Sequence, residues 1–437
     1  MELIEKISEL KEMFYKDENN SYVLNVFWNS LFIAFLLMPL GINMPTPFFI
    51  IAVITGIINI FKSKKNFIAD NKVLLLFPFY FLLMAISLIY TENIPDGVAL
   101  LQRSLTLLFF PVIFLFVKED ALTVRKLFDF LLWGLIVSFF INLSLAGYDT
   151  FIAVTNDGIT NDHSPESFIL SLTSAWDYFI NTEFSRLINP NYVSIYILLV
   201  LSYYLKKDVA SKTRLAVVVI LFIYLFLSAS IASYITLLIV SLLLISDIAD
   251  KTKKHTTLII FFLGAIVFLN NPHVLNFYEG PDNTIHEKES TEETSEKLRF
   301  LSWDAGWKLM SQSPLLGYGI GDANKELIEK YKELNYTQNY KRRYNAHNQF
   351  LQTWLQMGMP GLITLISIFI ILAYRMRRSR SEMSVFIILF ISLLFESMLV
   401  RFNGIVFFSI IVPLLLKKRS ILSSKIIRNE TVFTDRI

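Results

Sequence analysis

The chain has 437 residues, of which 54% are hydrophobic and 15% aromatic, while only 18% are charged. This composition is too apolar for a soluble globular protein of this size and places the chain in the membrane class. The formal net charge of +3 identifies no partner, and the lack of cysteine excludes disulfides, thiolate catalysis and cysteine-ligated metals.

The N-terminus is polar, and long apolar runs follow it. Residues 1–21 lack the apolar core and cleavage site of a signal peptide, so we expect a cytoplasmic segment there and a first span that serves as its own insertion signal. About twelve later runs are long enough, or nearly so, to cross roughly 30 Å of hydrocarbon as helices. They cover residues 22–41, 46–61, 73–90, 98–117, 127–147, 190–205, 215–229, 231–246, 256–270, 360–374, 384–400 and 403–416.

Basic residues set the expected orientation. Every even-numbered run ends in a cluster of lysine or arginine, such as the lysines within 62–65 after the second run. Basic residues next to a span resist export and stay in the cytoplasm. We therefore expect both termini in the cytoplasm, including the tail 417–437, and two long loops, 148–189 and 271–359, on the outer face.

These patterns predict an all-α polytopic membrane protein with about twelve transmembrane helices. Helices 1–9 fall within 22–270, with the exoplasmic loop 148–189 among them, and helices 10–12 fall within 360–416. Between helices 9 and 10 we expect a large, partly helical exoplasmic (periplasmic) loop, 271–359, that carries the catalytic residues.

The second part of this loop has folded character. A helical period runs from 298 to 310, and Pro314 ends it. A turn with glycines at 317, 319 and 321 follows, and Asp322 is expected to cap a short helix that reaches about Leu334. No strand precedes the Gly-x-Gly-x-Gly run, so nucleotide binding there is poorly supported.

One histidine of the five, His347, lies between this folded loop and a membrane helix. It could simply cap the helix that follows or sit at the membrane interface. It could also act as a general base, because histidine titrates near neutral pH and can take a proton from a hydroxyl group.

Three arginines on the outer side stand out. Arg299 lies among aromatic residues and is either a surface arginine that extends to solvent or a phosphate ligand with paired donors. Arg186 precedes the turn 189–192, where it is either solvated or directed at the site. Arg103 lies inside the fourth span near its outer end and should face the bundle or a water-filled cavity.

The remaining charged residues of the outer side do not indicate a catalytic or metal-binding role. Glu396 and Arg401 flank the outer end of the eleventh span and are most simply a structural ion pair. No HxxH or HExxH arrangement and no exoplasmic Asp-x-Asp is present, so we expect neither a metal nor another cofactor.

Two motifs together resemble a known family. The pattern R-x3-W-x3-W-x6-PLLGYGIG over 299–321 is one, and His347-Asn348 followed by an apolar helix with Gly358-Met-Pro-Gly361 is the other. The combination resembles the O-antigen ligase and O-antigen polymerase superfamily of bacterial membrane glycosyltransferases. The similarity covers roughly 185–416, and the first five spans are similar in layout alone. Family members often carry a second arginine where this chain has Ile231.

The resemblance implies a metal-independent, inverting glycosyltransferase. It would move a glycan from an undecaprenyl-diphosphate carrier to an acceptor hydroxyl, on the periplasmic face of the bacterial cytoplasmic (inner) membrane. The family's base maps onto His347 and its diphosphate-binding arginine onto Arg299. Arg186 is our preferred replacement for the second arginine, and Arg103 is the other candidate. Further contacts to the diphosphate or glycan are expected from Tyr192, Asn348 and Trp303.

Several functions fit this chemistry. We favour an O-antigen ligase whose acceptor is lipid A–core, with membrane lipid as a partner and no nucleic acid. The alternatives are an O-antigen or exopolysaccharide repeat-unit polymerase and a protein O-glycosylating relative, because each of their acceptors also offers a hydroxyl. A lipid-linked glycan flippase or transporter is the non-enzymatic alternative. The spans carry almost no charge at their centres, which disfavours a transporter.

Overall fold

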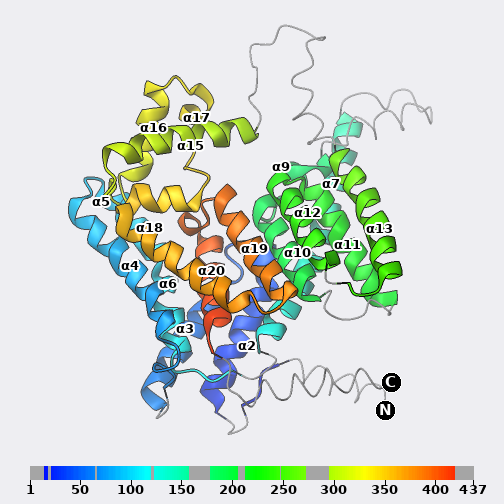
Figure 1. Cartoon of the computed structure of the whole chain (residues 1–437), viewed down its shortest axis with the longest axis horizontal. Coiled ribbons are helices and arrows are strands. Elements are labelled where there is room, and N and C mark those ends of the chain that lie inside the picture. Colours follow the sequence, from blue (N-terminus) through cyan, green and yellow to red (C-terminus); the bar gives the residue numbers. More distant parts are fainter. Residues whose placement is uncertain are drawn as a thin grey trace.

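The computed structural model of the chain describes residues 14–17, 21–63, 66–119, 123–156, 178–204, 212–246, 248–271 and 295–418. Within these residues the regular structure is entirely helical. Figure 1 shows the long helices packed side by side, with α15, α16 and α17 gathered at one end of the bundle.

The first part of the bundle consists of apolar helices with short 3-10 extensions. Its elements are α2 (Tyr22–Leu37), η1 (Met38–Leu40), α3 (Thr46–Lys62), η2 (Lys72–Leu75), α4 (Leu76–Ser87), η3 (Leu88–Tyr90), α5 (Ile94–Arg103), α6 (Leu105–Phe114) and α7 (Thr123–Asn156). Helices α5 and α6 follow each other with only the buried Ser104 between them. The run expected over 98–117 is therefore one span with a break.

The second part contains the remaining bundle helices and the outer domain. Its elements are α9 (Asn181–Phe184), α10 (Pro190–Tyr204), α11 (Lys212–Ser228), α12 (Ile231–Ser246), α13 (Lys251–Leu269), α15 (Ser295–Gln312), α16 (Ala323–Glu333), α17 (Thr337–Arg342), α18 (Gln349–Met376), α19 (Arg380–Phe395), η6 (Met398–Val400) and α20 (Phe402–Leu416). We refer to α15, α16 and α17 as the outer domain.

The helices support the expectation of an all-α membrane protein. Within the residues that the structure describes, the predicted apolar runs fall on helical structure, and six helices are long and apolar enough to cross a membrane. These six are Tyr22–Leu40, Lys72–Tyr90, Ile94–Phe114, Thr123–Ile152, Lys251–Leu269 and Gln349–Met376. Shorter apolar helices, such as α12 and α20, accompany them. The count of twelve spans stays a prediction.

Helix α20 lies at the centre of the bundle, as Figure 1 shows, and nearly all of its residues are buried. Its aromatic side chains contact helices on several sides: Phe407 packs on Phe35 and Tyr196, and Phe408 packs on Phe77 and Phe369. A helix that is apolar on every side belongs in the interior of a bundle. Helix α13, by contrast, has no buried residue.

The outer domain has a small core of its own, to which α18 contributes. Leu309 of α15, Leu327 and Tyr331 of α16 and Leu355 of α18 are buried together. Asp322 was predicted to cap α16; its position is confirmed, but the expected capping hydrogen bond is not formed. Asp322 stands at the N-cap position, but its carboxylate makes no capping bond and instead accepts hydrogen bonds from the backbone of residues 92 and 93. The outer domain is thereby tied to the start of α5.

Glycines allow the outer domain to pack directly on the backbone of α18. Gly317 and Gly358 have φ of +68° and +64°, in the region that side chains disfavour. A Cβ at Gly317 would lie 2.5 Å from Leu355 O, and one at Gly358 would collide with Leu315 O. The glycine run therefore serves close packing, and Gly358 breaks the helical geometry of α18 where the two segments meet.

Candidate functional site

The start of α18 places His347 at the foot of the outer domain. Asn348 is the N-cap of α18, and its side chain accepts a hydrogen bond from Leu351 N at 3.1 Å. His347 has φ of +46°, which is uncommon for a residue other than glycine and typical of functional positions. Its N–H donates to Asn345 Oδ1 (3.0 Å), and its carbonyl accepts from Trp303 Nε1 (3.3 Å). The capping role belongs to Asn348, which leaves the imidazole available for other contacts.

The imidazole faces a buried carboxylate from the connection between α19 and α20. His347 Nδ1 lies 3.8 Å from Glu396 Oε2, and both side chains are largely buried. Asn191 at the start of α10 donates to the same oxygen at 3.3 Å. Leu399 N donates to Gln349 Oε1 at 2.6 Å, which joins the connection to the first residue of α18. These contacts fix Glu396 relative to His347.

The charge of Glu396 is set by competing effects. Burial would raise the pKa of the carboxyl, but His347, Arg401 and Arg299 outweigh burial and hold this pKa below its usual value. Glu396 is therefore an anion at neutral pH. The close ion-pair contact of Glu396 is with His347, whereas Arg401 is solvent-exposed and acts at longer range. The expected ion pair of Glu396 with Arg401 therefore does not describe its closest contact, which is with His347.

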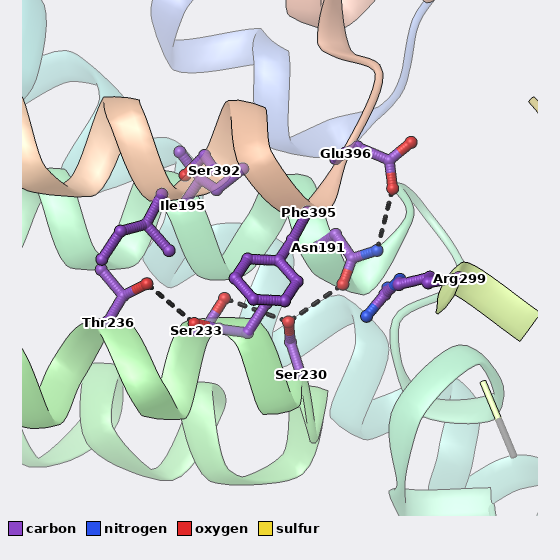
Figure 2. A pocket seen from close by; sticks show the side chains of 11 residues that line it. Asn191, Ile195, Ser230, Ser233, Thr236, Arg299, Ser392, Phe395 and Glu396 are labelled. Carbon is purple, nitrogen blue, oxygen red and sulfur yellow. Dashed lines mark hydrogen bonds between the residues drawn. The ribbon is translucent and has the colours of Figure 1, made fainter. Parts of the chain in front are cut away.

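Arg299 shares a small cavity with the same carboxylate. It lies near the start of α15, is 9% exposed, and lines this cavity together with Glu396 and Asn191, toward which it points in Figure 2. The other lining residues are Ile195, Ser230, Ala232, Ser233, Thr236, Ile391, Ser392 and Phe395. The free space is about 20 Å³, enough for roughly one water molecule. His347 is not in the lining and meets the cavity through Glu396.

Hydroxyl groups at the start of α12 form the wall opposite Arg299. Ser230 Oγ donates to Asn191 Oδ1 at 2.9 Å, and Ser233 Oγ donates to Ser230 Oγ at 3.1 Å, as Figure 2 shows. Ala232 also lines the cavity, but Ile231 does not. At the position of the family's second arginine, the wall thus carries serine hydroxyls and the N-terminal end of a helix, which bears partial positive charge.

The two arginines that we expected as second cations lie elsewhere. Arg186 contacts the carboxylate of Asp149, lies 3.7 Å from Glu183 Oε2 and donates from Nε to the Glu183 carbonyl at 3.0 Å. Arg103 is exposed at the end of α5. Neither arginine lines the cavity that holds Arg299.

Two of the other expected contact residues lie beside the site without lining it. Tyr192 is 2% exposed in α10, and its hydroxyl has no hydrogen-bond partner among the residues that the structure describes. Trp303 donates from Nε1 to the His347 carbonyl, and the centroid of its ring lies 5.8 Å from the centroid of the Phe395 ring. Trp303 thereby packs on a residue that lines the cavity.

Sequence reasoning missed Glu396 and Asn191 as site residues. A buried acid at the end of a membrane helix is expensive, which is itself a signal of function. Asn191 sits in the turn that drew attention to Arg186, and its amide joins Glu396 to Ser230.

Two comparisons with known proteins give the chain a family context. The family model described as O-antigen ligase matches residues 216–366, which include Arg299 and His347. An uncharacterized protein of Haemophilus influenzae is 23% identical over 368 residues, covering 81% of this chain and 84% of the relative. The family is associated with glycosyltransferase activity of the O-antigen ligase and polymerase type. Together with the helical membrane architecture, this match supports membership of the O-antigen ligase superfamily.

Proposed function

We propose that the chain is an O-antigen ligase, which transfers a glycan from undecaprenyl diphosphate to a hydroxyl of lipid A–core at the outer face of the inner membrane. The observation that carries this proposal is the position of Glu396, which contacts His347 and shares a cavity with Arg299. A candidate base and a candidate phosphate ligand therefore lie next to one carboxylate, at the end of α19.

His347 is the proposed general base. Nδ1 lies 3.8 Å from Glu396 Oε2, and in the proposed mechanism the imidazole carries its proton on Nδ1, which leaves the Nε2 lone pair to accept a proton. The acceptor hydroxyl gives its proton to Nε2 while its oxygen forms the new bond to the anomeric carbon. The bond from that carbon to the phosphate oxygen breaks, and undecaprenyl diphosphate leaves with the electron pair. Attack opposite to the leaving group inverts the anomeric centre.

Arg299 is the proposed ligand of the leaving diphosphate. Negative charge grows on the phosphate oxygen as the glycosidic bond breaks, so a fixed guanidinium stabilises the transition state more than the ground state. Ser230 and Ser233 are proposed to donate hydrogen bonds in place of a second arginine. The present cavity is too small for a diphosphate. Because Arg299 belongs to the outer domain and the serines to the bundle, we expect the two parts to separate when the donor binds.

Lipid profiles test this function directly. In a deletion strain we expect lipid A–core without polymer, together with accumulated long lipid-linked chains. Complementation with His347→Ala should leave this profile unchanged, whereas His255→Ala on α13, far from the site in the sequence, should restore polymer attachment. Single repeat units on lipid A–core would indicate a lost polymerase instead, and a normal profile in the deletion strain would exclude both functions.

A further inference from the structure

One face of α4 and of the adjoining η3 is apolar and exposed. Phe79, Leu82, Ile86 and Ile89 are each 45% exposed or more, and their spacing of three or four residues places them on one side of the helix. Helix α4 belongs to a candidate membrane span that ends at Tyr90. This face is therefore the lipid-facing side of the span.

Helix α18 has a second face of the same kind. Ile363, Ile366, Ile370 and Tyr374 are exposed at helical spacing, beginning shortly after the break at Gly358. They too belong to a candidate membrane span. The upper end of this face, like that of α4, marks the level at which the hydrocarbon region ends.

A turn of the outer domain closes the top of both faces. Tyr90 Oη donates to the Leu316 carbonyl at 2.8 Å, and Met359 N donates to the Leu315 carbonyl at 3.2 Å. The backbone of the turn is thus bonded to the ends of both spans, while the side chains of Leu315 and Leu316 are 71% and 59% exposed. The two leucines extend both apolar faces beyond the ends of the helices.

Tryptophan lies beside this turn. Trp307 of α15 is 65% exposed and packs edge-on against Trp354, with 6.3 Å between ring centroids. The indole N–H of Trp354 donates to the Pro314 carbonyl at 2.8 Å, which holds the turn in place. Tryptophan is enriched where membrane and water meet, because its ring is apolar and its N–H is polar.

We propose that this edge of the outer domain inserts into the interfacial region of the outer lipid leaflet. The apolar edge consists of Ile89, Trp307, Leu315 and Leu316, and its partner is a lipid surface. Continuity with two lipid-facing helix faces favours lipid over a protein partner. Lys332, on the exposed surface of α16, lies on the part of the outer domain that we assign to water.

This contact has a consequence for the site, which rests on the proposed function. Trp307 and Arg299 are eight positions apart on α15, or about 12 Å along the helix axis. Figure 1 shows α15 lying across the end of the bundle above α18. Insertion of the apolar edge would hold Arg299 near the level of the lipid headgroups, where the diphosphate of a lipid-linked donor lies.

Single-cysteine labelling tests the lipid contact, because the chain has no native cysteine. A nitroxide label would be attached to Leu315→Cys and Leu316→Cys in lipid nanodiscs, and its collisions with oxygen and with a water-soluble nickel chelate would be compared. Ile370→Cys serves as the lipid reference and Lys332→Cys as the water reference. All four side chains are exposed, so the substitutions should not disturb folding.

We expect labels at 315 and 316 to collide more with oxygen than with the nickel chelate, as the label at 370 should. The label at 332 should collide more with the nickel chelate than with oxygen. Nickel collisions as frequent as at 332 would overturn the proposal and leave the edge in water. Low collision rates with both reagents would also overturn it, because a protein partner or a second copy would then cover the edge. The measurement reads depth and not turnover, so its outcome is independent of glycan transfer.

Discussion

Replacing Glu396 by glutamine keeps the size of the side chain and removes its charge. At 3.8 Å and an effective dielectric constant of about 20, a carboxylate stabilises a neighbouring imidazolium by about 4 kcal/mol. In the proposed mechanism the acceptor proton passes to His347, so we expect this stabilisation to act on the transition state. Since about 1.4 kcal/mol corresponds to a factor of ten, Glu396→Gln should lower kcat by up to about 10³-fold.

The assay is the release of undecaprenyl diphosphate by purified protein in nanodiscs, with a lipid-linked glycan donor and lipid A–core as acceptor. Glu119→Gln is the matched control. Glu119 is a largely buried carboxylate, ion-paired with Lys417 near the expected cytoplasmic end of the bundle, so its loss should affect stability and spare turnover. Donor affinity should change little in Glu396→Gln. A loss of turnover below about tenfold, or one equal to that of the control, would refute the role assigned to Glu396.

Three further substitutions test neighbouring parts of the account. Arg299→Lys keeps the charge but loses the paired donors and should lower kcat by about 10²-fold; near-normal turnover would indicate a surface arginine. Arg186→Ala should keep turnover within a few-fold, because Asp149 and Glu183 already occupy this arginine; a large loss would restore it as the second cation. Gly358→Ala should destabilise the protein by about 1–3 kcal/mol, seen as a lower Tm, because of its positive φ; an unchanged Tm would contradict the packing argument.

The membrane helices were predictable because burial in lipid requires long apolar runs, which a sequence displays directly. A helix directly after His347-Asn348 was also expected, and α18 does begin at Gln349. The apolar run from about 360 did not predict that the segment 349–357 joins the membrane span through the break at Gly358. The outer domain stabilises that first segment by packing on it, through contacts that no local pattern displays.

The candidate site was predictable only in part. His347 and Arg299 were found through family motifs, whose spacing is visible in the sequence. Glu396 was interpreted as a partner of Arg401, the nearest cation along the chain, because its contact with His347 depends on how α18 and α19 pack. Arg186 was preferred as the second cation because it lies on the expected outer side and directly before the turn 189–192. The acid that engages it, Asp149, comes from the distant end of α7, which a sequence does not place.

The central claim is that His347 removes the proton of the acceptor hydroxyl. Single-turnover transfer by His347→Ala in reconstituted bilayers, with donor binding measured on the same sample, tests it most directly. The account predicts wild-type donor affinity and a transfer rate lower by about 10²–10⁴-fold, the usual contribution of a general base. Transfer at the wild-type rate by this variant would contradict it.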